Sequence, residues 1–98
     1  MLFRSYHPTF YENYTAIDHT AASYLISRGL KLIGIDYLSI GPYHHGNVET
    51  HQALLRNEVI IVEGLDLTSV DEGHYTLVCL PIRIACDGAP YRAVLMPG

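Results

Sequence analysis

The stretch Thr50–Leu67, THQALLRNEVIIVEGLDL, joins the end of a helical pattern to a short run of apolar residues typical of a strand. His51 lies in the first turn of the expected helix, and Glu63 follows where the strand ends. A helix followed by a short strand can bring these two side chains to one end of a sheet. Because imidazole and carboxylate groups are ligands for zinc and similar divalent ions, the stretch predicts His51 and Glu63 as metal ligands. Two ligands alone do not complete such a site.

A second helix is expected immediately before this strand, over residues 48–57. Asn47 is expected to cap it, and its apolar face is predicted to consist of Val48, Leu54 and Leu55. An earlier helix is expected to begin at Thr15, since Thr15 and Asp18 form a pair that resembles a capping box. Gly29 is expected to end that helix, because glycine readily adopts positive φ.

Each expected helix is followed by an apolar strand, KLIGI at 31–35 and VIIV at 59–62. Both are continuous apolar runs, which is typical of strands covered on both faces. Helices and strands that alternate with short connections indicate an α/β fold, so we expect these two strands to be parallel.

The C-terminal third predicts a hairpin. Residues 75–85, YTLVCLPIRIA, indicate a long strand interrupted by Pro81, and Asp87-Gly88 is a strong hairpin signal before a return strand at 93–96. A short strand is also expected at residues 2–4, and the aromatic residues of the loop 5–14 are expected to pack onto the domain itself rather than form a binding surface.

The composition indicates one small domain with apolar surface to spare. The chain has 98 residues, of which 49% are hydrophobic and only 16% charged, below the roughly 25% charged residues of an average globular chain. The surplus points to a subunit contact or to a separate partner domain, so we expect a homo-oligomer or a complementing partner.

Charge and hydropathy exclude several classes of protein. The net charge is −4 and the six basic residues are scattered, so nucleic-acid binding is not expected. No segment approaches the ~20 apolar residues of a spanning helix, and no membrane association or secretory signal is expected. Cys79 and Cys86 are expected to be free thiols separated by an extended strand, which favours a cytoplasmic location.

Chemistry is expected where the parallel strands end, because ligands of open α/β sheets gather outside these carboxyl ends. Asp36 follows the first strand and Glu63 ends the second, and His51 can face the same crevice. The alternative is that the histidine and glutamate are structural. His44 and His45 either add ligands or are exposed loop residues. The sequence contains neither a nucleophile elbow nor a glycine-rich phosphate loop.

Three blocks of the sequence resemble the metal-dependent cyclase family, whose best-known members are bacterial kynurenine formamidases. They are LISRGLKLIGIDYLSIGP, HGNVETHQALLRNEVIIVEGLDL and GHYTLVCLPIRIACDGAPYRAVL. The resemblance implies half of a swivelling β/β/α fold, with a mixed sheet, two helices and a C-terminal hairpin. It also implies zinc- or manganese-dependent hydrolysis of an amide or N-formyl group. His51 and Glu63 match two of the family's metal ligands, and Asp36 and Ser39 match a structural G-I-D-x-x-S turn.

The chain departs from the family in lacking the signature H-x-G-T-H-x-D-x-P-x-H, which supplies most of the metal ligands and the general acid/base. We therefore expect residues 1–98 to be a single truncated cyclase-like domain that corresponds to the C-terminal half of a family member. Such a chain has an incomplete metal site and is expected to be inactive alone. The alternatives are a non-catalytic homo-oligomeric binding module, or a metal site rebuilt across subunits or with a complementing N-terminal half.

Overall fold

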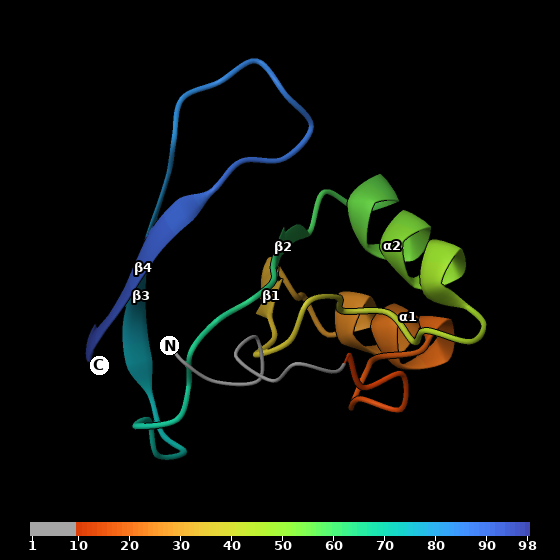
Figure 1. Ribbon diagram of the computed structural model, residues 1–98, viewed down its shortest axis with the longest axis horizontal. Coiled ribbons are helices and arrows are strands. Elements are labelled where there is room, and N and C mark those ends of the chain that lie inside the picture. Colours follow the sequence, from red (N-terminus) through yellow and green to blue (C-terminus); the bar gives the residue numbers. More distant parts are fainter. Residues whose placement is uncertain (1–9) are drawn as a thin grey trace.

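Two helices and a parallel strand pair form one unit of the computed structural model, and an antiparallel hairpin lies beside that unit (Figure 1). The structure describes residues 10–98, so the strand expected at residues 2–4 lies outside the described residues. The expected class, α/β with two helices and a C-terminal hairpin, is confirmed. The expectation of one mixed sheet is wrong for residues 10–98, because the parallel pair and the hairpin form separate two-stranded sheets.

Helix α1 spans His19–Ser27 and begins later than its apolar pattern predicts. Its N-cap is Asp18, whose carboxylate accepts a hydrogen bond from the backbone N–H of Ala21 at 2.8 Å. Thr15 is therefore not the cap, because the extended backbone and the reaching side chain both belong to Asp18. Gly29 follows the helix with a φ of 90°, as expected for a residue that ends a helix.

Helix α2 spans Asn47–Arg56 and starts from a glycine. Gly46 is the N-cap with a φ of 79° and gives the helix no side-chain cap, a conformation that favours glycine because it has no Cβ. The prediction that Asn47 caps the helix is wrong. Asn47 is instead the first helical residue, and its side chain turns toward the preceding loop.

Strands β1, Leu32–Gly34, and β2, Ile60–Val62, are parallel, as predicted. Only three residues of each apolar run are paired, so both strands are shorter than expected. The expectation that they are covered on both faces is wrong for Ile60, which is exposed. Within residues 10–98 no further strand pairs with either edge of this sheet.

The core lies between the two helices and the parallel pair (Figure 1). Its buried members are Ala22, Ile40, Leu54 and Val59. Of the three residues predicted for the apolar face of α2, only Leu54 is buried, whereas Val48 and Leu55 are exposed. Thr50 is also fully buried, and its hydroxyl donates to the carbonyl of Ile17 at 2.8 Å. The two helices therefore contact the core through few side chains, Ala22 of α1 and Thr50 and Leu54 of α2.

The hairpin consists of β3, Tyr75–Pro81, and β4, Tyr91–Pro97, with Pro81 opposite Tyr91. β3 ends at Pro81 rather than at residue 85, and one further main-chain bond, from the N–H of Ile82 to the carbonyl of Pro90 at 2.9 Å, follows it. The hairpin indicated by Asp87-Gly88 is confirmed, and residues 82–90 connect its strands, so these two residues lie within the loop.

Three other expectations concern the periphery. Phe10, Tyr14 and Tyr37 form mutual ring contacts with centroids 4.7 to 5.7 Å apart, which confirms for Phe10 and Tyr14 that aromatic residues of this loop pack onto their own domain. Tyr11 is exposed, and Tyr6 lies outside the described residues. Cys79 and Cys86 are both free. No helix within residues 10–98 is long and apolar enough to cross a membrane.

Candidate metal-binding site

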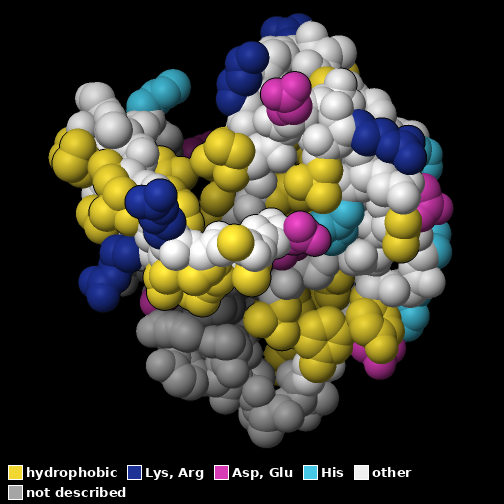
Figure 2. Space-filling model, turned by 90° about the horizontal axis from the view of Figure 1, so that it is seen from above, with side chains coloured by type: hydrophobic (Ala, Val, Ile, Leu, Met, Phe, Trp, Pro, Cys, Tyr) yellow, Lys and Arg dark blue, Asp and Glu magenta, His cyan; other side chains and the backbone are white. Residues whose placement is uncertain are grey.

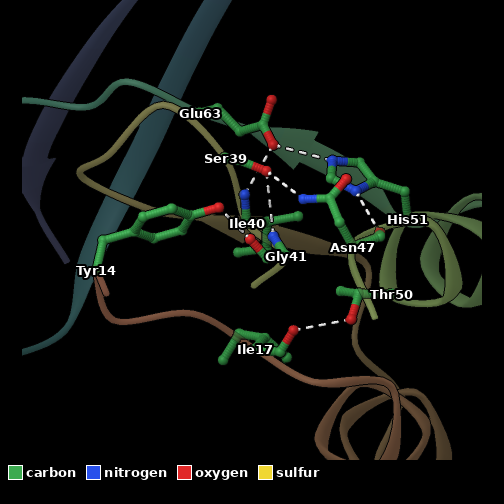
Figure 3. Close-up of polar contacts among 9 residues, drawn as sticks. All are labelled: Tyr14, Ile17, Ser39, Ile40, Gly41, Asn47, Thr50, His51 and Glu63. Atoms are coloured by element: carbon green, nitrogen blue, oxygen red, sulfur yellow. Dashed lines mark hydrogen bonds and ion pairs between the residues drawn. The ribbon is translucent and has the colours of Figure 1, made fainter. Parts of the chain in front are cut away.

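His51 and Glu63 meet as the sequence predicts. The Nε2 atom of His51 lies 3.1 Å from Oε2 of Glu63 (Figure 3). His51 projects from α2, on its second turn rather than the first, and Glu63 directly follows the last residue of β2. The two side chains are 28% and 33% exposed, so the pair is half-buried and still open to solvent.

The other ring nitrogen of His51 determines what Nε2 can do. Nδ1 lies 2.9 Å from the main-chain carbonyl oxygen of Asn47, one helical turn earlier. A carbonyl oxygen only accepts hydrogen bonds, so Nδ1 carries a proton and donates it. In the neutral ring Nε2 therefore presents a lone pair toward the carboxylate of Glu63.

The carboxylate of Glu63 is held from the loop that follows β1. The main-chain N–H of Ile40 donates to Oε2 at 2.8 Å, which is the oxygen that faces His51 (Figure 3). Gly64, the next residue, has a φ of 76° and turns the chain away from the strand. These two features fix Glu63 between the end of β2 and the loop.

Ser39 and Asn47 connect the same loop to the start of α2. The side-chain amide of Asn47 donates to Oγ of Ser39 at 3.0 Å, and the N–H of Gly41 donates to that oxygen at 3.4 Å. The loop approaches the helix closely, since a Cβ on Gly41 would lie only 3.0 Å from the Cα of Asn47. Tyr14 donates its hydroxyl proton to the carbonyl of Gly41. The structural role expected of Ser39 is consistent with these contacts.

Tyr91 contacts the main chain of Glu63 rather than its carboxylate. Its hydroxyl, at the start of β4, donates to the main-chain carbonyl of Glu63 at 2.6 Å. Burial raises the pKa of Tyr91 above 10.0, and the charges of Cys79 and Glu63 raise it further. The tyrosine is therefore neutral and able to donate at physiological pH.

The donor set of His51 and Glu63 fits a zinc-like ion. Ligand bonds of about 2.0–2.2 Å at a tetrahedral angle place two ligand atoms roughly 3.4 Å apart, and the observed separation is 3.1 Å. A ring N–H that donates to a backbone carbonyl is also the usual support of a metal-binding histidine. Two lone-pair groups that face each other need a proton or a cation between them.

The other candidate residues do not join this pair. Within residues 10–98 no group of three or more His, Cys, Asp or Glu side chains is placed to hold a metal ion. Among residues 10–98, Asp36 therefore does not join His51 and Glu63 as a third ligand, contrary to the crevice expected from the sequence. His44 pairs with Glu12 at 3.5 Å on the exposed surface, so it does not supply a third ligand here.

A groove of about 840 Å³ separates the hairpin from the parallel strands. Its lining includes Glu63, Leu65, Leu77, Tyr91 and Leu95, so the groove is mainly apolar and reaches the candidate site. Hydrophobic side chains gather over the hairpin and its loop, at the left of Figure 2. The groove therefore places an apolar surface beside the carboxylate.

Sequence reasoning missed three groups that support the pair: the N–H of Ile40, the carbonyl of Asn47 and the hydroxyl of Tyr91. The first two are main-chain groups, which do not depend on the residue type, so the sequence could not predict their role. Tyr91 lies 28 positions from Glu63 and comes near it only through the placement of the hairpin.

No protein-family model matches the sequence. The chain is 38% identical over 84 residues to the kynurenine formamidase of Maricaulis maris, a match that covers 85% of this chain and 40% of that protein. It is 38% identical over 85 residues to the kynurenine formamidase of Bordetella pertussis, covering 86% of this chain and 41% of that protein. The chain thus spans about two fifths of the length of these curated relatives.

A solved structure of a potential metal-dependent hydrolase with cyclase activity superimposes with a TM-score of 0.82 at 35% sequence identity. The superposition covers 93% of this chain and 45% of that one. The arrangement of helices, parallel pair and hairpin therefore occurs as part of a longer chain in this similar protein.

Proposed function

Because the chain belongs to the cyclase and kynurenine formamidase family over the part that it shares with its relatives, we propose that it supplies His51 and Glu63 to the divalent-metal site of a hydrolase that acts on carbon–nitrogen bonds. In this proposal the chain provides half of a swivelling β/β/α domain. The remaining ligands and the general acid/base come from a complementing segment or from a second copy of the chain.

The contact between Nε2 of His51 and Oε2 of Glu63, at 3.1 Å, carries the proposal. Asn47 fixes the proton on Nδ1, so a neutral His51 turns a lone pair toward an acceptor. A divalent cation bound by both atoms would turn this repulsion into two ligand bonds. Zinc and manganese both accept an imidazole nitrogen together with a carboxylate oxygen.

The described residues have separate tasks in this site. A divalent ion bound here would supply Lewis-acid activation of a water and of the substrate carbonyl. His51 and Glu63 would hold the ion, while Ile40 orients the carboxylate through its N–H and Asn47 sets the ring orientation of His51. The apolar groove beside Glu63 offers a surface for the hydrocarbon part of an amide or N-formyl substrate.

The metal part of the proposal is tested by calorimetric titration of the chain with zinc and with manganese. Two protein ligands give weak binding, which we expect His51→Ala and Glu63→Ala to abolish. His44→Ala is the matched control, since His44 is an exposed histidine paired with Glu12 away from the site. Equal binding by wild type and by both site variants would contradict the proposal.

The catalytic part is tested with N-formylkynurenine and added zinc or manganese. The isolated chain is expected to show negligible turnover, because its sequence lacks the family signature that supplies the general acid/base. Adding a polypeptide with the rest of a family domain is expected to produce turnover, and Glu63→Ala is expected to remove it. Turnover that survives Glu63→Ala would contradict the assignment of this residue.

A second candidate function is a non-catalytic homo-oligomeric binding module, favoured by the outer face of the hairpin. Leu80, Val94 and Met96 are exposed there, a concentration of apolar surface typical of an interface. In this case sedimentation at micromolar concentration should show a symmetric oligomer that binds no metal through His51. A well-folded monomer would argue strongly against this candidate.

A further inference from the structure

The main-chain groups of Glu63 face the free edge of the parallel sheet. On β2, Ile60 donates its N–H to the carbonyl of Lys31, and the carbonyl of Val62 accepts from Ile35, so residues 60 and 62 turn toward β1. Main-chain groups of successive strand residues alternate in direction. The carbonyl of Glu63 therefore points away from β1, toward the side on which the hairpin lies.

Tyr91 supplies the donor at this edge. Its hydroxyl reaches the carbonyl of Glu63 at 2.6 Å and takes the place that the N–H of a neighbouring strand would fill. The hairpin belongs to a separate two-stranded sheet, so a side chain rather than a strand ladder makes this contact. The position of the hairpin is thereby coupled to the backbone of Glu63.

We propose that Tyr91 is a positioning residue for Glu63, through which the placement of the hairpin controls the geometry of the candidate metal site. The proposal rests on the proposed function. Ile40 holds the carboxylate of Glu63, and Tyr91 holds its main-chain carbonyl on the side away from β1. Main-chain bonds at Val62 and Gly64 tie the other side to the segment after β1, so loss of the Tyr91 contact removes the restraint that comes from the hairpin. Metal ligands tolerate deviations of only about 0.2 Å.

The position of the hairpin can reach the site through this one contact. A two-stranded hairpin is at best marginally stable by itself, and Tyr91 and Glu63 both line the groove between the hairpin and the parallel pair. A shift of the hairpin relative to the parallel pair is therefore transmitted to the carbonyl of Glu63 by the hydroxyl of Tyr91.

The test compares Tyr91→Phe with Tyr75→Phe, each of which removes one hydroxyl from the hairpin. Tyr75 is the matched control because its hydroxyl also donates to a carbonyl, that of Asp71 at 2.8 Å, away from Glu63. Cobalt(II), a spectroscopic substitute for zinc, reports affinity through its visible absorption. We expect Tyr91→Phe to weaken cobalt binding about tenfold, at the lower end of the effect of outer-shell partners, and Tyr75→Phe to bind as wild type does.

A readout without metal keeps the role of Tyr91 separate from the proposed function. The ring ¹⁵N resonances of His51 report its contact with Glu63, and we expect them to change in Tyr91→Phe but not in Tyr75→Phe. If wild type binds no cobalt through His51 and Glu63, the proposed function fails, and the ring resonances still decide the role of Tyr91. Unchanged resonances in Tyr91→Phe overturn the proposal, even when its melting temperature falls, because the hydroxyl then has a structural role only.

Discussion

The α/β unit and the hairpin are both rich in apolar residues, yet they bury them differently. Leu54 of the α/β unit is 0% exposed, whereas Leu80 and Val94 of the hairpin are 61% and 49% exposed. The α/β unit closes a core with its own helices, but the hairpin turns one apolar face to the groove and the other to solvent. The difference indicates that the α/β unit carries the folding stability, while the hairpin depends on what covers it.

The largest expected effect tests the core of the α/β unit with two adjacent leucines. Leu54→Ala should lower the free energy of unfolding by about 2–5 kcal/mol, because it removes a fully buried side chain and leaves a cavity. Leu55→Ala is the matched control, since Leu55 is exposed, and should change stability by less than about 0.5 kcal/mol. Urea denaturation measures both, and equal losses would contradict the assigned core.

The next effect concerns the part-buried hydrogen bond of the buried Thr50. Thr50→Val keeps the shape of the side chain but removes the hydroxyl that donates to the carbonyl of Ile17. The carbonyl loses its buried donor, which should cost about 1–3 kcal/mol. Thr76→Val, on an exposed position of β3, is the control. Urea denaturation that places both variants at wild-type stability would show that Thr50 does not hold the segment before α1.

A smaller effect concerns the exposed cap of α1. The N–H of Ala21 and the hydroxyl of Thr20 hold the pKa of Asp18 below its usual 3.8. A lowered pKa in the folded state stabilises the fold above pH 3.8, and this contribution is lost as the pH falls through the folded value. Asp18→Ala should lower the melting temperature slightly at pH 7. Below pH 4 the melting temperature of the variant should decrease less steeply with falling pH than that of wild type. The melting temperatures of wild type and variant are measured as a function of pH, and curves with the same slope below pH 4 would contradict the prediction.

The smallest effect is expected in the hairpin. Val94→Ala should leave the unfolding free energy of a monomer within about 0.5 kcal/mol of wild type, because half of the side chain is already exposed. The same substitution should weaken any oligomer or complementing complex that covers this face. Denaturation at several protein concentrations separates the two effects. If Val94→Ala lowers the free energy of unfolding at low concentration as much as Leu54→Ala does, the hairpin contributes to folding stability as the α/β unit does, which contradicts the contrast drawn above.

Local sequence patterns predicted the elements better than their ends. The alternation of helices with KLIGI and VIIV was sufficient for the parallel pair, because apolar runs at these spacings leave few other arrangements. The start of α1 was misplaced, since Thr15 and Asp18 are both plausible caps and only the backbone decides between them. Asp87-Gly88 correctly indicated a hairpin, but the strand expected to reach residue 85 ends at Pro81 and its partner begins at Tyr91.

The sequence likewise predicted only part of the candidate site. The approach of His51 and Glu63 followed from the order of helix and strand and is confirmed as a contact. Its supports were not predictable, because the N–H of Ile40 and the hydroxyl of Tyr91 arrive through tertiary packing over 23 and 28 positions. The metal role of the pair stays a prediction.

The close approach at Gly41 has a consequence for how this protein can vary. A methyl group there would lie 3.0 Å from the Cα of Asn47 and 3.1 Å from its carbonyl oxygen, the oxygen that orients His51. Any larger residue requires the loop and the first turn of the helix to separate by a few tenths of an ångström, which would displace the carbonyl that orients the imidazole. The orientation of the His51 ring thus depends on Gly41, and replacing one hydrogen atom of this glycine by a methyl group would change that orientation although Gly41 does not contact the ring.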